Sequence, residues 1–313
     1  MKKVIRVVTR GSQLALTQSK DVIKRLENIH PGHEFKLNIL KTDGDRFQSI
    51  PLSSFTRTGI FVKELENALL AGEGELAVHS LKDAPTSRIE GLTISAYLER
   101  EDWRDSLVWP AVKRPNNDSH QIIGTGSLRR RLQLQSRFPE WEFREIRGNV
   151  DTRLKKMLDG DFHAILLATA GMNRLNLLAD NSTIEHEKLD EALMLPAPGQ
   201  GCVAIETRSS DSEVISLVKE LNHTETAVCV QAERYFLSEM EGGCKTPIGV
   251  LAQIKNAKLC LDAWVGDPRN GKSIRSNTVG ELAQFKNLAE NLAREMRKDA
   301  LENGIDYTFE RHH

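Results

Sequence analysis

Apolar and polar residues alternate with two different periods along the first hundred positions. Four short runs are typical of strands, at residues 4–9, 35–40, 76–78 and 92–96. Two longer stretches have helical spacing, the first opening at Ser12 and stopping before Pro31-Gly32, the second running from Phe61 to Gly72. The order strand, helix, strand, helix, strand, strand predicts an α/β sheet.

A second alternating block follows the polar, proline-bearing stretch at residues 110–120. Strands are expected at residues 121–124, 142–146 and 164–168, with helices starting near Ser127, Val150 and Ala170. The segment 195–201 contains two prolines and two glycines, which exclude a regular helix. It is therefore predicted to be a crossover or hinge.

The last ninety residues have a different pattern. A long helical stretch from Thr224 to about Met240 ends at Gly242-Gly243. Strand-like runs follow at residues 248–254, 258–265 and 273–279, and then an amphipathic helix begins near Leu282. The order predicts a smaller α+β domain.

Composition excludes several classes of protein. The 313 residues carry 43 Lys plus Arg against 44 Asp plus Glu, and this balance argues against a surface designed for nucleic acid. Disorder is excluded because 39% of the residues are hydrophobic and the net charge is only −1. No apolar run is long enough for a membrane span or signal peptide, so no membrane association and a cytoplasmic location are expected. The four cysteines lack metal-ligand spacing, so no metal site is predicted.

Two turns in the chain have the same composition. Val8 to Ser12 and Ile123 to Ser127 each run from a strand through a polar, glycine-containing turn to a serine that opens a helix. The free amides of a helix N-terminus attract anions, so each turn is a candidate anion site. The alternative, that both serines only cap their helices, stays open.

Arginines are concentrated next to the second turn. Residues 124–156 hold nine basic and four acidic side chains, a net charge of +5 in a chain of −1. Arg129 and Arg130 lie in the first turn of a predicted helix, where the helix dipole disfavours cations. Arg147 and Arg153 follow the next strand and should project from the same sheet edge. The block is interpreted as a cradle for carboxylates or phosphates; a solvated basic face is the alternative.

Two further residues have candidate chemistry. Asp83 follows a buried-looking strand in His79-Ser80-Leu81-Lys82-Asp83, where it could act as an acid or base, or only stabilise a turn. Cys244 follows two glycines and precedes Lys245, which makes it more accessible than the other cysteines. An unreactive loop cysteine is the alternative for this position.

Taken together, the motifs resemble the porphobilinogen deaminase (hydroxymethylbilane synthase) family. The resemblance spans nearly the whole chain and rests on segments in the family's order: Thr9-Arg10-x-Ser12, Gly59-Ile60-Phe61-Val62-Lys63-Glu64-Leu65, His79-Ser80-Leu81-Lys82-Asp83, Gly124-Thr125-x-Ser127-Leu128-Arg129-Arg130, Arg147-Gly148-Asn149-Val150-x-Thr152-Arg153, Pro198-Gly199-Gln200-Gly201 and Glu241-Gly242-Gly243-Cys244.

The resemblance implies two α/β domains like type II periplasmic binding proteins plus a smaller C-terminal α+β domain. Domain 1 would comprise residues 1–99 and about 200–219, domain 2 residues 103–195, and domain 3 residues 223–313. It also implies a monomer that condenses four porphobilinogen molecules head to tail into hydroxymethylbilane and releases ammonia. The growing chain would start from a covalently bound dipyrromethane cofactor.

The resemblance also assigns roles to individual residues. Asp83 would be the catalytic carboxylate, and Cys244 would attach the cofactor. Residues matching the family's cofactor contacts are Ser80, Lys82, Thr125, Ser127, Arg129, Arg130, Arg147, Gly148 and Arg153. Substrate contacts would come from Arg10, Ser12, Arg147, Arg153 and Gln200. Gly126 stands where many members have serine, and Thr58, in a lid-like loop at 43–58, stands where lysine is common.

One other class of protein explains part of the pattern. A non-catalytic anion-binding protein of the periplasmic-binding-protein type would use the serine turns and the arginines. It would leave the glycine-flanked Cys244 and the C-terminal domain without a role.

Overall fold

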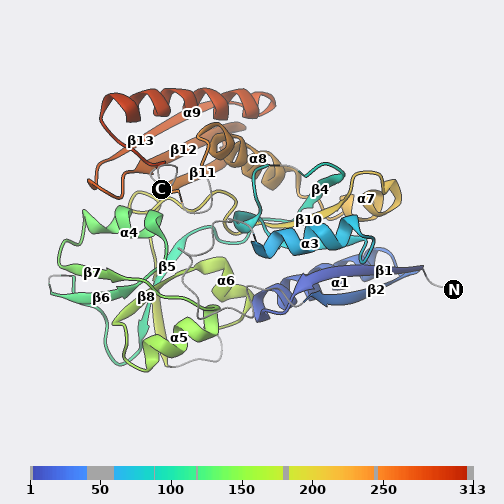
Figure 1. The fold of residues 1–313 in the computed structure, drawn as a ribbon, viewed down its shortest axis with the longest axis horizontal. Helices are drawn as coiled ribbons and strands as arrows, with labels where there is room; N and C mark the ends of the chain where they lie inside the picture. Colours follow the sequence, from blue (N-terminus) through green and yellow to red (C-terminus); the bar gives the residue numbers. More distant parts are fainter. Residues whose placement is uncertain are drawn as a thin grey trace. The chain divides into compact units, whose positions relative to one another are not determined.

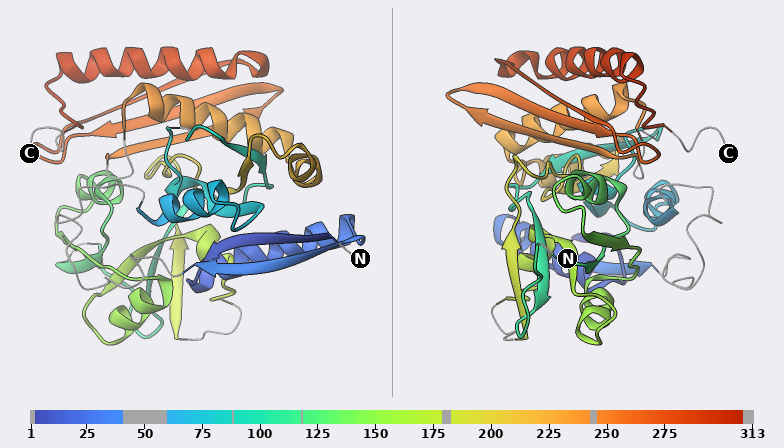
Figure 2. Two further views of the ribbon diagram at one scale, coloured as in Figure 1. Left: turned by 45° about the vertical axis from the view of Figure 1, so that its right-hand side comes forward. Right: turned by 90° about the vertical axis from the view of Figure 1, so that its left-hand side faces the viewer.

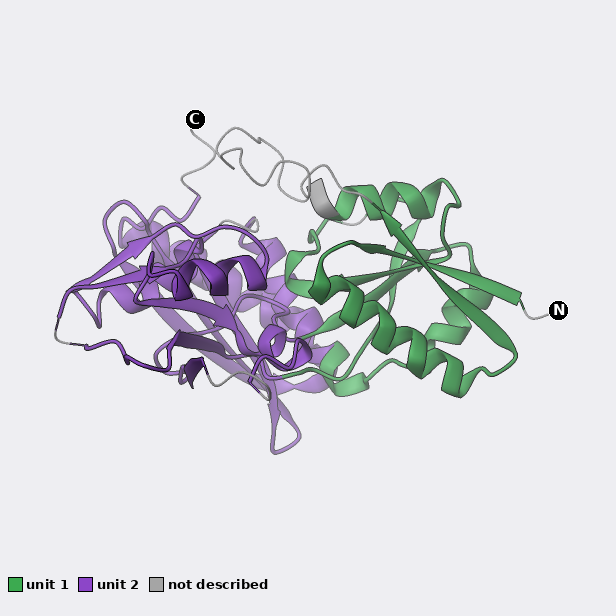
Figure 3. Ribbon diagram, turned by 90° about the horizontal axis from the view of Figure 1, so that it is seen from below, with its two compact units in different colours: residues 1–101, 202–227 green, residues 102–201, 228–313 purple. Residues whose placement is uncertain are grey.

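The computed structural model describes residues 3–40, 60–87, 89–117, 119–178, 183–242 and 246–308 (Figure 1). The chain divides into two compact units, each built from two separate stretches of sequence (Figure 3). Unit 1 comprises residues 1–101 and 202–227, and unit 2 comprises residues 102–201 and 228–313.

Unit 1 is built on a five-stranded mixed sheet with the order β2-β1-β3-β10-β4. Its strands are β1 (Lys3–Arg10), β2 (His33–Leu40), β3 (Leu76–Ser80), β4 (Leu92–Tyr97) and β10 (Val203–Arg208). β1 lies between β2 and β3 and is parallel to both, whereas β10 is antiparallel to β3 and β4. The carboxyl ends of β1 and β3 therefore meet at one edge of the sheet.

Helices cover both faces of this sheet. Val7 packs in a core with α1 (Gln13–Ile29) and α7 (Ser212–Lys219), while the next residue, Val8, packs in a separate core with α3 (Ile60–Leu70). Successive side chains of a strand point to opposite faces, so β1 is apolar on both. This explains why Val7 and Val8 are apolar at consecutive positions instead of alternating with polar residues.

Two elements of unit 1 were missing from the sequence prediction, strand β10 and helix α7. β10 is a buried run whose partners β3 and β4 lie more than a hundred positions earlier in the chain. Local patterning cannot show such a pairing, because the two sides of it are brought together only when the chain returns from unit 2.

Unit 2 contains a second sheet with the equivalent order, β7-β6-β8-β5-β9. Its strands are β5 (Asp105–Pro110), β6 (Gln121–Gly124), β7 (Trp141–Arg144), β8 (Ala164–Ala168) and β9 (Ile184–Lys188). Its helices are α4 (Leu128–Gln135), α5 (Val150–Leu158) and α6 (Thr169–Arg174). β5 and β9 were not predicted; β5 occupies the antiparallel position that β10 has in unit 1.

The C-terminal part of unit 2 is an antiparallel sheet of β11 (Ile248–Lys255), β12 (Lys258–Gly266) and β13 (Ser273–Glu281). Apolar side chains on one face pack against α8 (Thr224–Glu239) and α9 (Phe285–Glu302), and α9 runs along the sheet (Figure 2). On the other face, Leu251 and Trp264 pack against Leu132 and Leu195. This second contact joins the C-terminal sheet to the five-stranded sheet of unit 2.

The architecture confirms the predicted α/β class: two five-stranded mixed α/β sheets and a C-terminal antiparallel sheet with helices. The division into three domains stays a prediction, since residues 103–195 and 228–308 pack as parts of one compact unit. Within the described ranges, no helix is both long and apolar enough to cross a membrane.

Candidate functional site

Asp83 lies on a short, well-anchored turn at the end of β3. The turn is a single 3₁₀ turn, η2 (Leu81–Asp83), whose first residue is buried. The backbone amide of Leu81 donates to Cys202 O at 3.0 Å, and that of Ala84 donates to Leu81 O at 3.1 Å. Asp83 itself is exposed. The fold thus presents a carboxylate at the carboxyl edge of the unit 1 sheet on a backbone that is fixed on both sides.

Ser80 and Ser12 have protein partners at the same edge. Ser80 Oγ lies 3.0 Å from Gln18 Nε2 and 3.1 Å from Gln18 Oε1, on α1. The hydroxyl can therefore accept from the amide nitrogen or donate to the amide oxygen. Ser12 is the N-cap of α1, and its Oγ accepts from Ala15 N at 3.4 Å. The capping alternative for Ser12 is therefore realised, and the hydroxyl still has a hydrogen to donate.

Two basic side chains complete this edge of unit 1. Arg10 is the last residue of β1, and Lys82 lies in the η2 turn beside Asp83; both are half-buried. β1 and β3 are neighbouring parallel strands, so the ends that carry these residues are adjacent. One carboxylate, two cationic side chains and two serine hydroxyls thus share one sheet edge.

Behind this edge lies a buried acidic cluster. His79 Nε2 lies 3.0 Å from Glu206 Oε2, and both residues are buried, as is Glu66 on α3. Burial, followed by the charge of Glu206, raises the pKa of the Glu66 carboxyl, while His79 and Lys63 act in the opposite direction. The cluster contains two carboxyl groups and one imidazole, and the imidazole belongs to His79, the residue directly before Ser80.

In unit 2, two turns lie side by side at the carboxyl ends of β6 and β7. The amide of Thr125 donates to Arg144 O at 2.9 Å, which joins the first turn to the end of β7. The hydroxyl of Thr125 accepts from Ser127 N at 3.2 Å, and Ser127 Oγ, the N-cap of α4, accepts from Arg130 N at 3.4 Å. The capping alternative is therefore realised for Ser127 as well.

The second turn carries Arg147, Gly148 and Arg153. Arg147 is half-buried with a 29% exposed side chain, and its guanidinium pairs with Glu145 at 2.6 Å. Arg153 Nε donates to Gly148 O at 2.8 Å. Gly148 has φ of 112°, and a Cβ there would lie 2.6 Å from Thr152 Cγ2, so only glycine fits. This turn therefore keeps two guanidinium groups at a half-exposed sheet edge.

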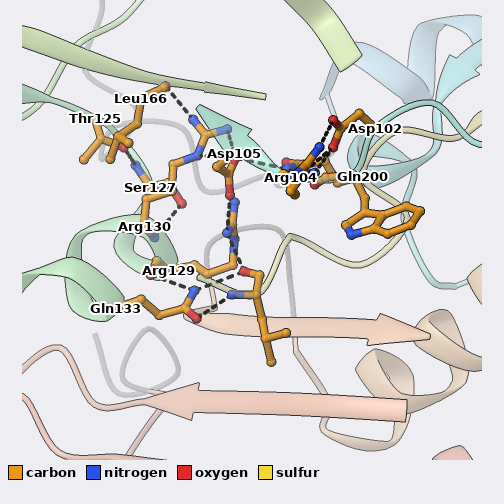
Figure 4. Close-up of polar contacts among 12 residues, drawn as sticks. Asp102, Arg104, Asp105, Thr125, Ser127, Arg129, Arg130, Gln133, Leu166 and Gln200 are labelled. Carbon is orange, nitrogen blue, oxygen red and sulfur yellow. Dashed lines mark hydrogen bonds and ion pairs between the residues drawn. The ribbon is translucent and has the colours of Figure 1, made fainter. Parts of the chain in front are cut away.

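Arg129 and Arg130 are placed differently from the predicted open cradle (Figure 4). They are only 5% and 6% exposed, and both guanidinium groups are bonded to the buried carboxylate of Asp105. Arg129 Nη1 also donates to Leu195 O at 2.7 Å, and Arg130 Nη1 donates to Leu166 O at 2.8 Å. The observed reason for cations in the first turn of α4 is thus an interior counter-charge, which outweighs the helix dipole.

Gln200, predicted to contact substrate, belongs to the same buried network. Its Nε2 donates to Trp103 O at 2.8 Å and to Asp105 Oδ1 at 3.0 Å. Burial alone would raise the pKa of Asp105, but Arg129 and Arg130 hold that pKa far below its ordinary value. Asp105 was not among the residues predicted from sequence, although a charged residue opening the apolar run Leu107-Val108-Trp109 was a signal.

Cys244 and the loop at 43–58 lie outside the described residues. The described chain before Cys244 is firmly packed. Gly242 N donates to Leu237 O at 3.0 Å, and a Cβ on Gly242 would lie 2.7 Å from both Ile248 Cδ1 and Leu237 Cδ1. A glycine is therefore required at position 242, the first glycine of the cysteine motif, where the chain leaves α8.

The donor set fits a cofactor whose pyrrole rings carry carboxylates. The half-exposed candidates are guanidinium, ammonium and hydroxyl groups, all of which donate hydrogen bonds to carboxylate oxygens. Within the part of the chain that the structure describes, no group of three or more His, Cys, Asp or Glu side chains is arranged to hold a metal ion.

Two family models match the chain. The model for "porphobilinogen deaminase, dipyromethane cofactor binding domain" matches residues 5–216, and that for "porphobilinogen deaminase, C-terminal domain" matches residues 227–298. Among curated relatives, a porphobilinogen deaminase of Sulfurimonas denitrificans is 42% identical over 97% of this chain and 95% of its own. One of Streptococcus sanguinis is 40% identical over 94% of this chain and 95% of its own.

Solved structures with a similar fold are far more distant in sequence. The VFT2 domain of BvgS from Bordetella pertussis is 14% identical, with a TM-score of 0.42 over 70% of this chain and 86% of its own. The BenM effector-binding domain with benzoate is 15% identical, with a TM-score of 0.43 over 71% of this chain and 91% of its own.

Proposed function

Because this chain belongs to the porphobilinogen deaminase family, we propose that Asp83 is the carboxylate that carries out its condensation reaction. The family activity makes the protein a transferase of tetrapyrrole biosynthesis with a domain that binds a dipyrromethane cofactor. Porphobilinogen is its substrate. The alternative of a non-catalytic anion-binding protein is therefore wrong.

Asp83 suits this role by its placement. Loss of ammonia from porphobilinogen leaves a positively charged pyrrole with an electrophilic methylene carbon. The free α-carbon of the growing chain's last ring bonds to that carbon and then loses its proton. A fixed carboxylate stabilises the charge and can accept or relay the proton. Asp83 is exposed on a turn held by the burial of Leu81 and by two backbone hydrogen bonds. This anchored but exposed acid is the observation that carries the proposal.

The half-exposed donors would hold the carboxylates of the cofactor and the growing chain. In unit 2 these are Arg147, Arg153 and Ser127 at the N-terminus of α4, and the buried Thr125 next to them is proposed as a further contact. In unit 1 they are Arg10, Ser12, Ser80 and Lys82. Gly148 would act through its backbone, because its carbonyl oxygen accepts from Arg153 Nε at 2.8 Å and so orients that guanidinium. When bound, the cofactor supplies the free pyrrole carbon from which chain growth starts.

Arg129, Arg130 and Gln200 are also proposed as ligand contacts, on the strength of the family motifs. Their polar atoms form the buried network around Asp105. They are at most 6% exposed, so a contact with the ligand would be made by nearly buried groups that protein partners already orient, rather than by mobile side chains.

Cys244 is proposed to attach the cofactor through a thioether. Its thiolate would attack the electrophilic carbon left after ammonia leaves a porphobilinogen-derived pyrrole, so a carbon–sulfur bond replaces the carbon–nitrogen bond. The test is the intact mass of the full chain purified from porphobilinogen-sufficient cells. We expect a surplus of two pyrrole units that is absent in Cys244→Ser and present in the matched variant Cys260→Ser. An unmodified wild-type mass would exclude the attachment.

A monomeric state and a cytoplasmic location are further proposals. Both follow from the family expectation and not from a contact in the structure. Sedimentation of the purified protein at several concentrations tests the first, and fractionation of the source cells tests the second.

A further inference from the structure

The Asp105 carboxylate joins three parts of unit 2 that are distant in sequence (Figure 4). Asp105 opens β5 and is 0% exposed. Its Oδ2 accepts from Arg129 Nη1 at 2.7 Å, and its Oδ1 accepts from Arg130 Nη2 at 2.7 Å and Gln200 Nε2 at 3.0 Å. One carboxylate thus bonds to the first turn of α4 and to the segment that follows β9.

Two of the three points at which the chain passes between the units lie beside this carboxylate. The chain enters unit 2 at Asp102 and leaves it after Gly201. Gln200 Nε2 bonds to Trp103 O as well as to Asp105, which ties the outgoing segment to the incoming one. The two segments will be called the crossing segments, residues 102–105 and 195–201.

The outgoing crossing segment is held a second time through α4. Leu195 O accepts from Arg129 Nη1 at 2.7 Å and from Gln133 Nε2 at 3.1 Å, and Leu195 N donates to Gln133 Oε1 at 2.9 Å. Arg129 Nη1 therefore bridges Asp105 and Leu195 directly. The bonds from Arg129 and Gln200 connect the outgoing segment to Asp105, whereas the two Gln133–Leu195 bonds hold it independently of Asp105.

The charges of the network make Asp105 irreplaceable by a neutral residue. Two guanidinium groups and one carboxylate leave a net charge of +1 in an interior site. Asparagine has nearly the same shape, but its NH₂ group donates where the arginines also donate, and its amide carries no charge. The cluster would then hold two uncompensated cations, which strongly disfavours the present geometry.

Stability alone does not explain such a network. Replacement of buried ion pairs by well-packed apolar residues is often neutral or stabilising, so a sequence can build this interior without charges. What the charged version adds is a single defined geometry, because each guanidinium nitrogen has a specified acceptor.

We propose that Asp105 is a positioning residue that holds both crossing segments and the Arg129–Arg130 pair in one fixed arrangement. Its effect on chain elongation rests on the proposed function, in which Arg129, Arg130 and Gln200 face the ligand. Its effect on the crossing segments does not, and this makes the two parts separable by experiment.

The test compares Asp105→Asn with the matched control Asp102→Asn in the full chain. Asp102 is three residues away, has a 14% exposed side chain and pairs with Arg104 and Lys188, so the control also removes an ion-paired carboxylate. Hydrogen exchange followed by mass spectrometry reports on peptides that cover the crossing segments. We expect exchange in residues 195–201 to become about tenfold faster in Asp105→Asn, and to change by less than about twofold in the control.

Elongation supplies the second measurement. Wild type, Asp105→Asn and control are mixed with limiting porphobilinogen, and intact masses give the number of pyrrole units bound. A loss of folded protein lowers all species equally, whereas misplaced arginines make the one-unit and two-unit species accumulate. We expect that accumulation in Asp105→Asn only.

The outcomes separate the two proposals. Faster exchange with stalled elongation supports both. Faster exchange with wild-type elongation supports the positioning role and removes Arg129, Arg130 and Gln200 from the ligand contacts. Wild-type exchange in a folded Asp105→Asn overturns the positioning role, whatever the activity. If Asp105→Asn does not fold, Gln200→Met decides, because it removes the bonds from residue 200 to Trp103 and Asp105 and leaves the Arg129 bridge to Leu195 intact. Unchanged exchange in residues 198–201 overturns the proposal, and faster exchange there supports it.

Discussion

The two five-stranded sheets have equivalent strand orders but bury opposite excesses of charge. Behind β3, unit 1 buries Glu66 and Glu206 with one histidine, whereas beside the five-stranded sheet of unit 2 Arg129 and Arg130 are buried with Asp105. The exposed groups differ as well, because the end of β3 carries Asp83 while the end of β7 leads to Arg147 and Arg153. One topology thus supports one sheet edge that carries an exposed carboxylate beside Arg10 and Lys82, and another that is followed by two half-exposed arginines.

Under the proposed function, the two sheets contribute different groups to one reaction. A condensation that develops positive charge on a substrate with several carboxylates needs a fixed carboxylate and fixed cations that hold the substrate's carboxylates. The exposed carboxylate proposed for catalysis, Asp83, lies on the unit 1 sheet edge with Arg10 and Lys82, whereas Arg147 and Arg153 lie by the unit 2 sheet. The following predictions test this division.

The largest effect is expected from removal of the acid at the end of β3. Asp83→Asn should lower kcat by about 10²- to 10⁴-fold, the usual contribution of a general acid or base, while the cofactor stays bound. Steady-state kinetics and intact mass measure the two quantities. The matched change in unit 2 is Asp151→Asn, an exposed acid in the first turn of α5, which should change kcat by less than about twofold. Near-normal turnover in Asp83→Asn would remove Asp83 from its role.

A smaller effect is expected from the basic edge of unit 2. Arg147→Leu removes charge-assisted hydrogen bonds to a ligand carboxylate, so the apparent KM for porphobilinogen should rise about ten- to hundredfold. Arg144→Leu is the control, since Arg144 lies three residues before Arg147, is exposed and pairs with Glu142. Equal KM values in both variants would show that this edge does not bind the substrate.

The two serine caps give a third comparison between the sheets. Ser12→Ala and Ser127→Ala each remove an observed N-cap hydrogen bond, so each should lower the free energy of unfolding by about 1 kcal/mol. Urea unfolding measures that loss. If the hydroxyls also donate to ligand carboxylates, KM rises in both variants beyond the change seen in Thr152→Ser, which keeps a hydroxyl bonded to Asn149. Unchanged KM would leave both serines as caps only.

The smallest effect concerns the buried acids of unit 1. The pKa of Glu66 is raised in the folded protein, mainly by burial and then by Glu206, while His79 and Lys63 oppose the shift. Because the pKa of Glu66 is raised in the folded state, its ionisation lowers the free energy of unfolding as pH rises above its ordinary pKa of 4.5. Glu66→Gln should therefore gain stability relative to wild type between pH 5 and pH 8, as measured by urea unfolding.

The control and the opposite case sharpen this last prediction. Glu27→Gln changes an exposed acid on α1 and should show no such trend with pH. Asp105 has a lowered pKa, so its contribution to unit 2 is present at neutral pH and is lost as pH falls through the folded-state value. A pH-independent difference for Glu66→Gln would show that Glu66 is already paired as an anion.

Sequence patterns predicted the elements whose signals are local. The helices opening at Ser12 and Ser127 begin there, because capping and apolar spacing lie within a few residues of each other. The motifs at Asp83, Arg147 and Cys244 also indicated the family, which the full-length relatives confirm. The roles of these individual residues stay predictions.

Only the tertiary structure decided which charges face the interior. In the sequence, residues 124–156 form a single segment of net charge +5. Folding buries Arg129 and Arg130 against Asp105 and leaves Arg147 and Arg153 half-exposed. The same holds for β10, which joins its sheet from across the chain. Local spacing determines helices, caps and strand periods, whereas the partner of a charge or a strand depends on contacts between residues far apart in sequence. Folding is what brings those residues together.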